Sequence, residues 1–421
     1  MKLLQYLCLI VLVFSHSASL CSQPFRLGLE SIPATFLQNM NAASDQPFRV
    51  GLITNQTGKD QNGQRNLDLL VQRGIRVTKI FAPEHGFSGA VEAAHEVKDS
   101  KDVATGIEIV SLYGDGTGRT ISGDHLSGVD VLVFDIQDSG MRHYTYISTL
   151  LHAMQAAADH DKQFVVLDRP NPLGWQMEGP LVDPEIQNVK SFIAAAPIPL
   201  RHGMTIGELA WFYNKHVLTK PAKLHVVKMQ NYDRRHGLSV CPMTALSPNL
   251  QTVASCHGYS FLGLLGEIRP FDVGVNTDKA FQTIMLPEKL FMPDKWKQVE
   301  NLLNKYGIRS VQSVMREKGK KAEKYCGIHF EITDINSTSS FNLLLSLLNF
   351  FKSEGIELKF SNFFDRAIGT EHVRNHVVEG KNHAVLATKI NTDLDSFYAK
   401  AVDCFMYEPL PRVVRTELLG K

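Results

Sequence analysis

Carboxyl, amide, imidazole, phenol and guanidinium side chains follow the apolar, β-branched runs in the first half of this chain. Gathered in one place, such groups bind sugar hydroxyls and transfer protons. The candidates for catalytic carboxyls are Glu84, Asp135 and Asp168. The candidates for substrate contacts are Asn55, His85, Tyr113, Gln137, Tyr144, Arg169, Asn171 and His202.

Two carboxyl groups on either side of a glycosidic bond can cleave it. One protonates the leaving oxygen while the other activates water or attacks the sugar. Aromatic side chains, here Tyr113 and Tyr144, suit the apolar faces of a sugar ring. Each candidate carboxyl also has a structural alternative: Glu84 could cap a helix or loop, and Asp135 or Asp168 could fix its own turn.

The runs that precede these residues have the composition of strands buried on both faces, as in a parallel sheet. The carboxyl ends of parallel strands meet at one edge of a sheet, where ligands bind. A further apolar run, Ala194–Leu200, ends in Arg201-His202-Gly203 and is expected to reach the same edge. The other predicted strands are Val50–Thr54, Val77–Phe81, Ile107–Leu112, Val129–Asp135, Phe164–Asp168 and Leu224–Met229.

Helical patterns alternate with these runs. Apolar residues recur at helical spacing from Tyr144 to Ala158, and Thr205-x-x-Glu208 has the pattern of a capping box. Alternating strands and helices predict an α/β fold with right-handed crossovers. We therefore expect a Rossmann-like parallel-sheet domain over residues 24–235.

The pattern changes after about Pro242, where turn-rich stretches begin. A helix near residues 293–306, a strand over 326–334 and a helix over 341–351 follow. They predict a smaller α+β domain over residues 236–421, with an active cleft between the two domains.

Residues 1–23 have the pattern of a secretory signal peptide. Lys2 provides the positive charge, and the apolar stretch Leu3–Phe14 is too short to span a bilayer. We expect an exported protein of the periplasm or cell envelope. Cys21 leaves a lipid anchor as an alternative, although Leu20 stands where a lipobox has a small residue.

Composition and missing motifs exclude several classes of function. With 44 Lys and Arg against 43 Asp and Glu, the chain lacks the basic excess that nucleic acid or an anionic membrane requires. The fingerprints of dinucleotide-binding proteins, P-loop enzymes and α/β-hydrolases are absent. The stretch from Glu84 to Glu96 is rich in His and Glu but has no metal-ligand spacing, so neither a cofactor nor a metal is expected.

Long motifs occur in a fixed order along the chain, densely to about residue 215. They are GLITNQTG at 51–58, FAPEHG at 81–86, SLYG at 111–114, VLVFDIQDSGMRHYTY at 131–146, VLDRPNPLG at 166–174, EGP at 178–180, PLRHGMTIG at 199–207 and SPN at 247–249. Together they resemble the bacterial exo-β-N-acetylmuramidases of the NamZ type. The resemblance covers nearly all of the chain after residue 23.

This resemblance implies an active cleft between two domains and a catalytic role for Glu84, the acid of the PEHG motif. It also implies the release of terminal, non-reducing β-linked N-acetylmuramic acid from peptidoglycan fragments during cell-wall turnover. The second group stays open between Asp135, Asp168 and the acetamido group of the substrate. The alternatives are a non-catalytic carbohydrate-binding protein of the cell envelope, or a metal-dependent amidase or esterase that uses the same cleft.

One position departs from the family pattern, because Val275 stands where the family usually has an Arg. An Arg is the natural bidentate partner for the lactyl carboxylate of muramic acid. Lys279, Arg269 or Arg201 could take its place, although a Lys offers only a point charge. The chain is therefore predicted to be a divergent member of the family.

Overall fold

The computed structural model describes residues 24–417 apart from residues 35, 37–47, 93–94, 115–116, 119, 187–188, 190, 241, 291–292, 321 and 381–382. The predicted signal peptide, with Cys21, lies outside the described residues. No helix in the described part of the chain has both the length and the apolar character needed to cross a membrane.

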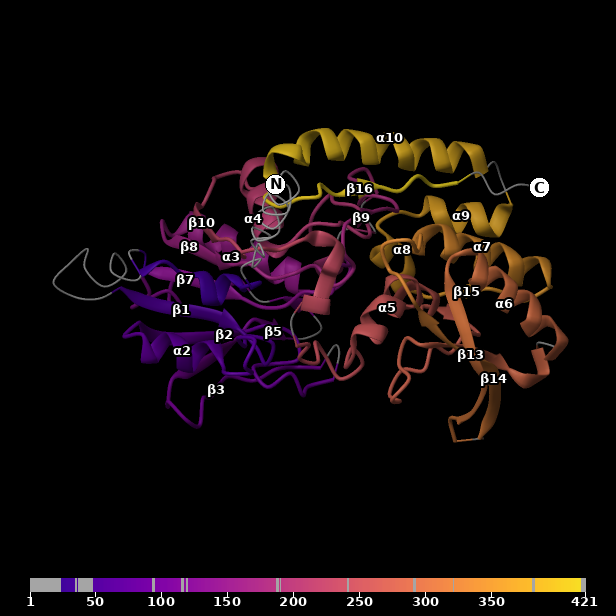
Figure 1. Ribbon diagram of the computed structural model, residues 1–421, viewed down its shortest axis with the longest axis horizontal. Helices are drawn as coiled ribbons and strands as arrows, with labels where there is room; N and C mark the ends of the chain where they lie inside the picture. The colour runs from indigo at the N-terminus through magenta and orange to yellow at the C-terminus, as the bar shows by residue number, and fades with distance from the viewer. Residues whose placement is uncertain are drawn as a thin grey trace, which may run out of the picture.

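A seven-stranded sheet with the order β10-β8-β7-β1-β2-β4-β3 forms the first half of the molecule (Figure 1). Only β3 runs antiparallel to its neighbour. In chain order the parallel strands lie as sixth, fifth, fourth, first, second and third, so the order reverses between β1 and β7. The strands are β1 (Arg49–Thr54), β2 (Arg76–Ala82), β3 (Ser100–Lys101), β4 (Glu108–Ser111), β7 (Val131–Asp135), β8 (Gln163–Leu167) and β10 (Lys223–Val227).

Helices cover both faces of this sheet, which explains why its strands are apolar throughout. Leu52 and Val133 face the helix α2 (Asn66–Gln72), whereas Ile53 and Phe134 face α3 (Tyr146–Asp159) and α4 (Ile206–His216). The predicted capping box at the start of α4 is confirmed, since Thr205 and Glu208 each accept a backbone N–H from the other.

The predicted strand Ala194–Leu200 is wrong. A short 3-10 helix, η3 (Phe192–Ala194), ends at its first residue, and none of residues 194–200 lies in a strand. Pro197 and Pro199 explain this result, because proline has no N–H to donate to a neighbouring strand.

A three-stranded antiparallel sheet, β12-β14-β13, forms the second unit. Its position overlaps the predicted strand over 326–334, and the predicted helix over 341–351 lies within α7. The strands are β12 (Thr283–Pro287), β13 (Ile308–Lys318) and β14 (Glu323–Ile332). The helices are α5 (Val253–Leu265), α6 (Trp296–Lys305), α7 (Ser340–Ser353), α8 (Asn362–Ile368) and α9 (His372–Glu379).

The C-terminal segment returns from the second unit to the first. Helix α10 (His383–Ala401) lies across both units, and β16 (Arg412–Val413) pairs with β9 (Gln176–Met177) (Figure 1). The remaining short elements are η1 (Gly28–Ser31), β5 (Tyr113–Gly114), β6 (Thr117–Gly118), η4 (Arg234–Val240), β11 (Ile268–Arg269), η5 (Glu288–Leu290), η6 (Pro293–Lys295), β15 (Lys359–Phe360) and η7 (Val402–Cys404).

Candidate active site

A cavity of about 460 Å³ lies between the two units, a volume typical of a small-molecule site. Aromatic and aliphatic side chains, among them Phe281 and Phe363, form much of its wall. The polar side chains that line it are Glu84, His85, His143, Tyr144, Thr145, Ser247, Asn249, Tyr259, Glu267, Arg269, Asp272 and Lys318.

Glu84 reaches this cavity from a tight turn after β2. His85 and Gly86 both adopt left-handed backbone conformations, with φ of 69° and 76°. The turn is closed by a hydrogen bond from the Gly86 N–H to the Pro83 carbonyl, and His85 Nδ1 donates to the Val91 carbonyl at 2.7 Å. A left-handed non-glycine residue costs free energy and is frequent at functional sites. The left-handed conformation of His85 therefore indicates that this turn belongs to a functional site.

The carboxylate of Glu84 is buried and accepts hydrogen bonds from two hydroxyl groups. Thr145 Oγ1, at the start of α3, donates to Glu84 Oε2 at 2.7 Å. Burial raises the pKa of Tyr113, and the nearby charge of Glu84 and their hydrogen bond raise it further, so the phenol keeps its proton. Neither donor carries a charge. Two neutral hydroxyl groups thus hold the carboxylate of Glu84 in position.

His143 is the least satisfied polar group of the cavity wall. It is only 7% exposed, and neither ring nitrogen has a hydrogen-bond partner among the described residues. Its ring packs against that of Tyr259, with the centroids 4.8 Å apart and the ring planes tilted by 34°. Burial, together with the charge of Arg142, lowers the pKa of His143 to about 3. The imidazole is therefore neutral near pH 7, with one ring nitrogen that can donate a hydrogen bond and one that can accept one.

Three side chains hold the carbonyl group that precedes the segment Ser247-Pro248-Asn249 at the cavity wall. The Leu246 carbonyl accepts from Gln56 Nε2 at 2.9 Å, Tyr146 Oη at 2.8 Å and Tyr144 Oη at 3.1 Å. These donors belong to the GLITNQTG and VLVFDIQDSGMRHYTY motifs. The hydroxyl of Tyr144 thus helps to shape the site through this carbonyl, and its ring lines the cavity.

The second unit contributes most of the charged side chains of the cavity wall, namely Glu267, Arg269, Asp272 and Lys318. Lys318 pairs with Asp272 at 2.8 Å, and Arg316 pairs with the same carboxylate at 3.2 Å. Arg269 is exposed; within the described residues it forms no ion pair. Val275, at the position where an Arg was expected, also lines the cavity.

The other two predicted carboxyls do not line the cavity. Asp135, at the end of β7, is fully buried and forms a bidentate pair with Arg169, with contacts of 2.6 and 3.0 Å. Asn66 Nδ2 donates to the same carboxylate at 2.8 Å. Because Arg169 follows β8, these charge-assisted hydrogen bonds join the carboxyl ends of β7 and β8. Such hydrogen bonds are among the strongest in proteins.

Asp168, at the end of β8, is also fully buried. Its oxygens accept from Tyr407 Oη at 2.7 Å, Thr205 Oγ1 at 2.8 Å and the Gly207 N–H at 2.8 Å. Burial raises the pKa of Asp168 to about 6, against the opposing effect of the hydrogen bonds from Tyr407 and Gly207. This carboxyl therefore links the sheet, α4 and the C-terminal segment.

The remaining predicted contact residues do not line the cavity at Glu84. Arg201 is fully buried and pairs with Glu178 at 2.9 Å. Lys279 does not line the cavity. Four others surround a crevice of only about 10 Å³ near the end of β7: Gln137, Arg169, Asn171 and His202. Asn55 binds Thr57 through its Oδ1, while its Nδ2 is buried with no hydrogen-bond partner among the described residues.

Sequence reasoning missed several cavity residues. His143 and Thr145 lie inside a recognised motif, so the motif itself was the available signal. Asp272 and Lys318 come from a part of the chain with few motifs, and nothing in their spacing shows that they line one cavity. In the described part of the chain, no three His, Cys, Asp or Glu side chains are placed to hold a metal ion.

Comparison with known proteins agrees with this architecture. The chain is 35% identical over 361 residues to the peptidoglycan β-N-acetylmuramidase NamZ of Bacillus subtilis, covering 83% of this chain and 84% of that protein. A DUF1343 family protein of Bacteroides fragilis superimposes with a TM-score of 0.78 at 29% identity, covering 91% of this chain and 99% of the other. A second from the same species has a TM-score of 0.68 at 24% identity, with the same coverage, and shares the fold.

Sequence profiles of one family match both halves of the chain. The profile of the N-terminal part of exo-β-N-acetylmuramidase NamZ matches residues 50–254, and that of the C-terminal part matches residues 257–407. The two matches meet close to the start of α5, where the chain passes into the second unit. The chain therefore belongs to the NamZ family.

Proposed function

We propose that this protein is a glycoside hydrolase that releases terminal, non-reducing β-linked N-acetylmuramic acid from peptidoglycan fragments. The observation that carries the proposal is Glu84, a buried carboxyl held by two hydroxyl groups at the wall of a sugar-sized cavity. The activity printed for the relative from Bacillus subtilis supports it. Export, with removal of residues 1–23, belongs to the same proposal.

Glu84 acts as the general acid in this reaction. Its proton passes to the glycosidic oxygen as the bond to the anomeric carbon breaks, because a sugar alkoxide is a poor leaving group. Thr145 fixes the direction of the carboxyl group through Oε2. His143, neutral and without a partner among the described residues, is available for a hydroxyl of the bound sugar.

The second group comes from the cavity or from the substrate. Asp135 and Asp168 are both committed to buried networks away from the cavity wall. The carboxyls that line the cavity beside Glu84 are Glu267 and Asp272. The other source is the acetamido oxygen of the substrate, which can attack the anomeric carbon from within the same sugar. The variants Glu267→Gln and Asp272→Asn distinguish these two sources. Loss of turnover in one of them would assign the second group to that carboxyl, whereas the acetamido group of the substrate is unaffected by either change.

The cavity also offers a partner for the lactyl carboxylate. Arg269 lies exposed on the cavity wall near Val275, whereas Lys318 already faces the charge of Asp272. A guanidinium group can bind a carboxylate through two parallel hydrogen bonds. Arg269 thus takes the part that an Arg at position 275 would have.

The proposal is tested by incubating the protein with the disaccharide N-acetylmuramyl-β-1,4-N-acetylglucosamine and measuring free N-acetylmuramic acid by mass spectrometry. The wild type should release the monosaccharide, and Glu84→Gln should not. Glu92→Gln is the matched control, because Glu92 is exposed and lies outside the cavity lining. Saccharide binding without release by the wild type would instead identify a carbohydrate-binding protein.

A further inference from the structure

An exposed phenylalanine, Phe363, lies in the wall of the cavity that contains Glu84. Among the Phe, Tyr and Trp residues that the structure describes, only Phe363 and Trp211 are exposed, by 57% and 38%. Trp211 does not line the cavity. A single exposed apolar side chain is ordinary on a protein surface. In the wall of a cavity with polar groups, however, an aromatic ring is typical of a ligand contact.

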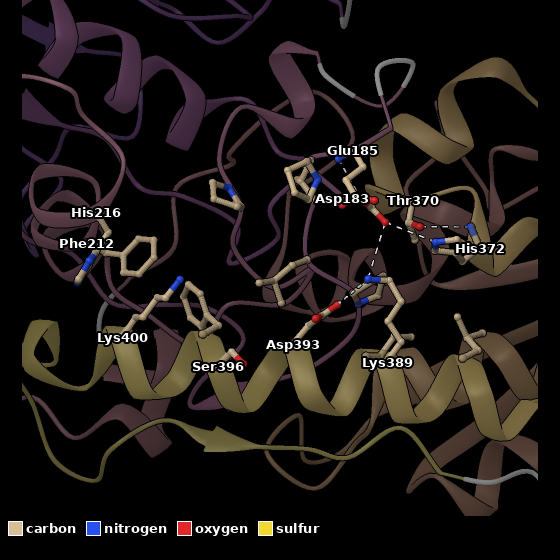
Figure 2. A pocket seen from close by; sticks show the side chains of 18 residues that line it. Asp183, Glu185, Phe212, His216, Thr370, His372, Lys389, Asp393, Ser396 and Lys400 are labelled. Atoms are coloured by element: carbon tan, nitrogen blue, oxygen red, sulfur yellow. Dashed lines mark hydrogen bonds and ion pairs between the residues drawn. The ribbon is translucent and has the colours of Figure 1, made fainter.

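The other large hollow of the molecule differs in this respect. A groove of about 690 Å³ lies beside α10 (Figure 2). The two phenylalanines that line it, Phe212 and Phe397, are both buried. Its Lys389 lies 3.9 Å from Asp183 and 3.3 Å from Asp393, so these charges already have partners. Of these two hollows, only the cavity at Glu84 has an exposed phenylalanine among its described lining residues.

Helix α8 presents Phe363 to the cavity from a fixed starting point. Phe363 and Ala367 are four residues apart and both line the cavity, so one face of α8 forms this part of the wall. Ser361 caps the helix, since its Oγ accepts from the Phe363 N–H at 3.1 Å. The same hydroxyl donates to Glu267 Oε2 at 2.6 Å, and the Ser361 N–H donates to the Glu267 carbonyl at 2.9 Å. The backbone at Phe363 is thus attached to another residue of the cavity wall.

The ring of Phe363 also has a neighbour on its own helix. The guanidinium group of Arg366 lies over the ring, with its central carbon 5.9 Å from the centroid. Such a cation–π contact favours one position of an exposed ring. Helix α8 further contacts η3, whose Ile193 lines the cavity. The two segments therefore bring apolar side chains from both units to one wall.

Exposure distinguishes the closed part of the cavity from its opening. Glu84 and His143 are each only 7% exposed, whereas Phe363 is largely exposed. An enzyme that removes a terminal, non-reducing sugar binds a chain that continues only beyond the bond to be cleaved. The leaving sugar must therefore lie towards the opening. Arg269, the other exposed residue of the wall, is assigned above to the lactyl group and not to a sugar ring.

The chemistry of the leaving sugar fits a phenylalanine. A β-linked N-acetylglucosamine carries its substituents near the plane of the ring, so its two faces consist of C–H groups. These faces suit an aromatic side chain, and Phe offers no polar group that would require a particular hydroxyl.

We propose that Phe363 is the contact surface for the sugar on the leaving side of the glycosidic bond, which is N-acetylglucosamine in peptidoglycan. This inference rests on the proposed function. Phe363 acts there as a positioning residue. By holding the leaving sugar, it keeps the glycosidic oxygen within reach of Glu84.

The kinetic test compares two substrates that differ only in the leaving group. One is N-acetylmuramyl-β-1,4-N-acetylglucosamine, and the other is β-N-acetylmuramyl fluoride, which has no second ring. In Phe363→Ala the ratio of kcat/KM for the disaccharide to kcat/KM for the fluoride should fall about tenfold, mainly through KM for the disaccharide. Phe363→Tyr should retain the wild-type ratio because it keeps the ring.

Trp211→Ala is the matched control, because it removes the other exposed aromatic ring from outside the cavity. It should leave the ratio unchanged. An unchanged ratio in Phe363→Ala, or an equal fall in Trp211→Ala or in Phe363→Tyr, would overturn the proposal.

A binding arm keeps this inference separate from the proposed function. Isothermal titration calorimetry on Glu84→Gln measures affinity for the intact disaccharide and for N-acetylmuramic acid alone. Adding Phe363→Ala should weaken disaccharide binding about tenfold more than monosaccharide binding. Equal weakening of both would place the terminal sugar at Phe363 and overturn the proposal. If the wild type released no monosaccharide but this difference appeared, the proposed hydrolysis would fail while the sugar contact at Phe363 would stand.

Discussion

The cavity at Glu84 and the polar network at the ends of β7 and β8 contain the same kinds of side chain. In the network, Asp135 and Asp168 are surrounded by donors from Arg169, Tyr407 and the start of α4. In the cavity, His143 has two ring nitrogens with no hydrogen-bond partner among the described residues. Catalytic potential therefore depends on which buried groups still have hydrogen-bonding capacity, since a satisfied network resists any new partner.

The largest difference between the two regions should appear when one carboxyl is changed in each. Glu84→Gln should lower turnover by about 10²–10⁴-fold, because an amide cannot transfer the proton to the leaving oxygen. Its melting temperature should stay near that of the wild type, since Thr145 can still donate to the amide oxygen. Turnover is measured with a chromogenic muramic acid glycoside, and retention of full activity would refute the assignment.

A buried ion pair of the network should matter for stability instead. Arg234 and Glu208 are both fully buried and paired. Arg234→Met leaves the carboxylate of Glu208 without its partner, which should cost about 3–5 kcal/mol of unfolding free energy in urea. Lys215→Met is the control, since its pair with Asp403 is exposed and should contribute little. If both changes lowered the free energy of unfolding equally, burial would not determine how much an ion pair contributes to stability.

The pH dependence of stability should also come from the network. The folded-state pKa of Asp168, about 6, lies above the ordinary value of 3.8. The folded protein therefore binds more protons between these values, and this carboxyl loses about 2–3 kcal/mol of its contribution as pH rises from 4 to 6.

This pH term is measured by urea unfolding of wild type and Asp168→Asn across that range. The difference in unfolding free energy, wild type minus variant, should fall as pH rises through the window. A constant difference would show that the carboxyl has no raised pKa. Asp403→Asn, at an exposed carboxyl, is the comparison variant.

The variant His143→Phe should affect turnover without lowering stability. The ring can still stack on Tyr259, and two unsatisfied nitrogens are removed, so stability should hold or rise. Turnover should fall about tenfold if the imidazole contacts a sugar hydroxyl, as loss of one hydrogen bond implies. Unchanged turnover would place His143 outside the reaction.

The smallest effect is expected at Arg269. Arg269→Met should raise KM several-fold with little change in kcat, because the contact to a carboxylate exists before and during the reaction. With the methyl ester of the substrate, wild type and variant should behave alike. If Arg269→Met raised KM for the methyl ester as much as for the free carboxylate, Arg269 would be shown to support the fold and not to bind the carboxylate.

The parallel sheet and its helices were predictable from the sequence, because their signals are local. β1, β2, β7, β8 and β10 overlap the predicted strands, and the Thr205 box lies at the start of α4. Ala194–Leu200 failed because hydrophobicity alone hides the effect of its prolines. The roles predicted for Asp135, Asp168 and the other contact residues stay predictions.

The residues of the cavity could be predicted only in part from the sequence. A carboxyl after a strand looks the same in sequence whether it enters a cavity, as Glu84 does, or binds an Arg from the next strand end, as Asp135 does. Arg269 and Lys318 line the same cavity as Glu84 because of tertiary contacts between the two units. No periodicity or spacing along a single chain records such a meeting.

The return of the C-terminal segment has a consequence for how the chain folds. Tyr407 supplies a hydroxyl to Asp168, and Arg412 pairs with Gln176 at the edge of the first unit. These residues are synthesised after the strands of the sheet that they complete. The first unit therefore lacks these contacts until the C-terminal segment has been made, and that segment then joins the two units.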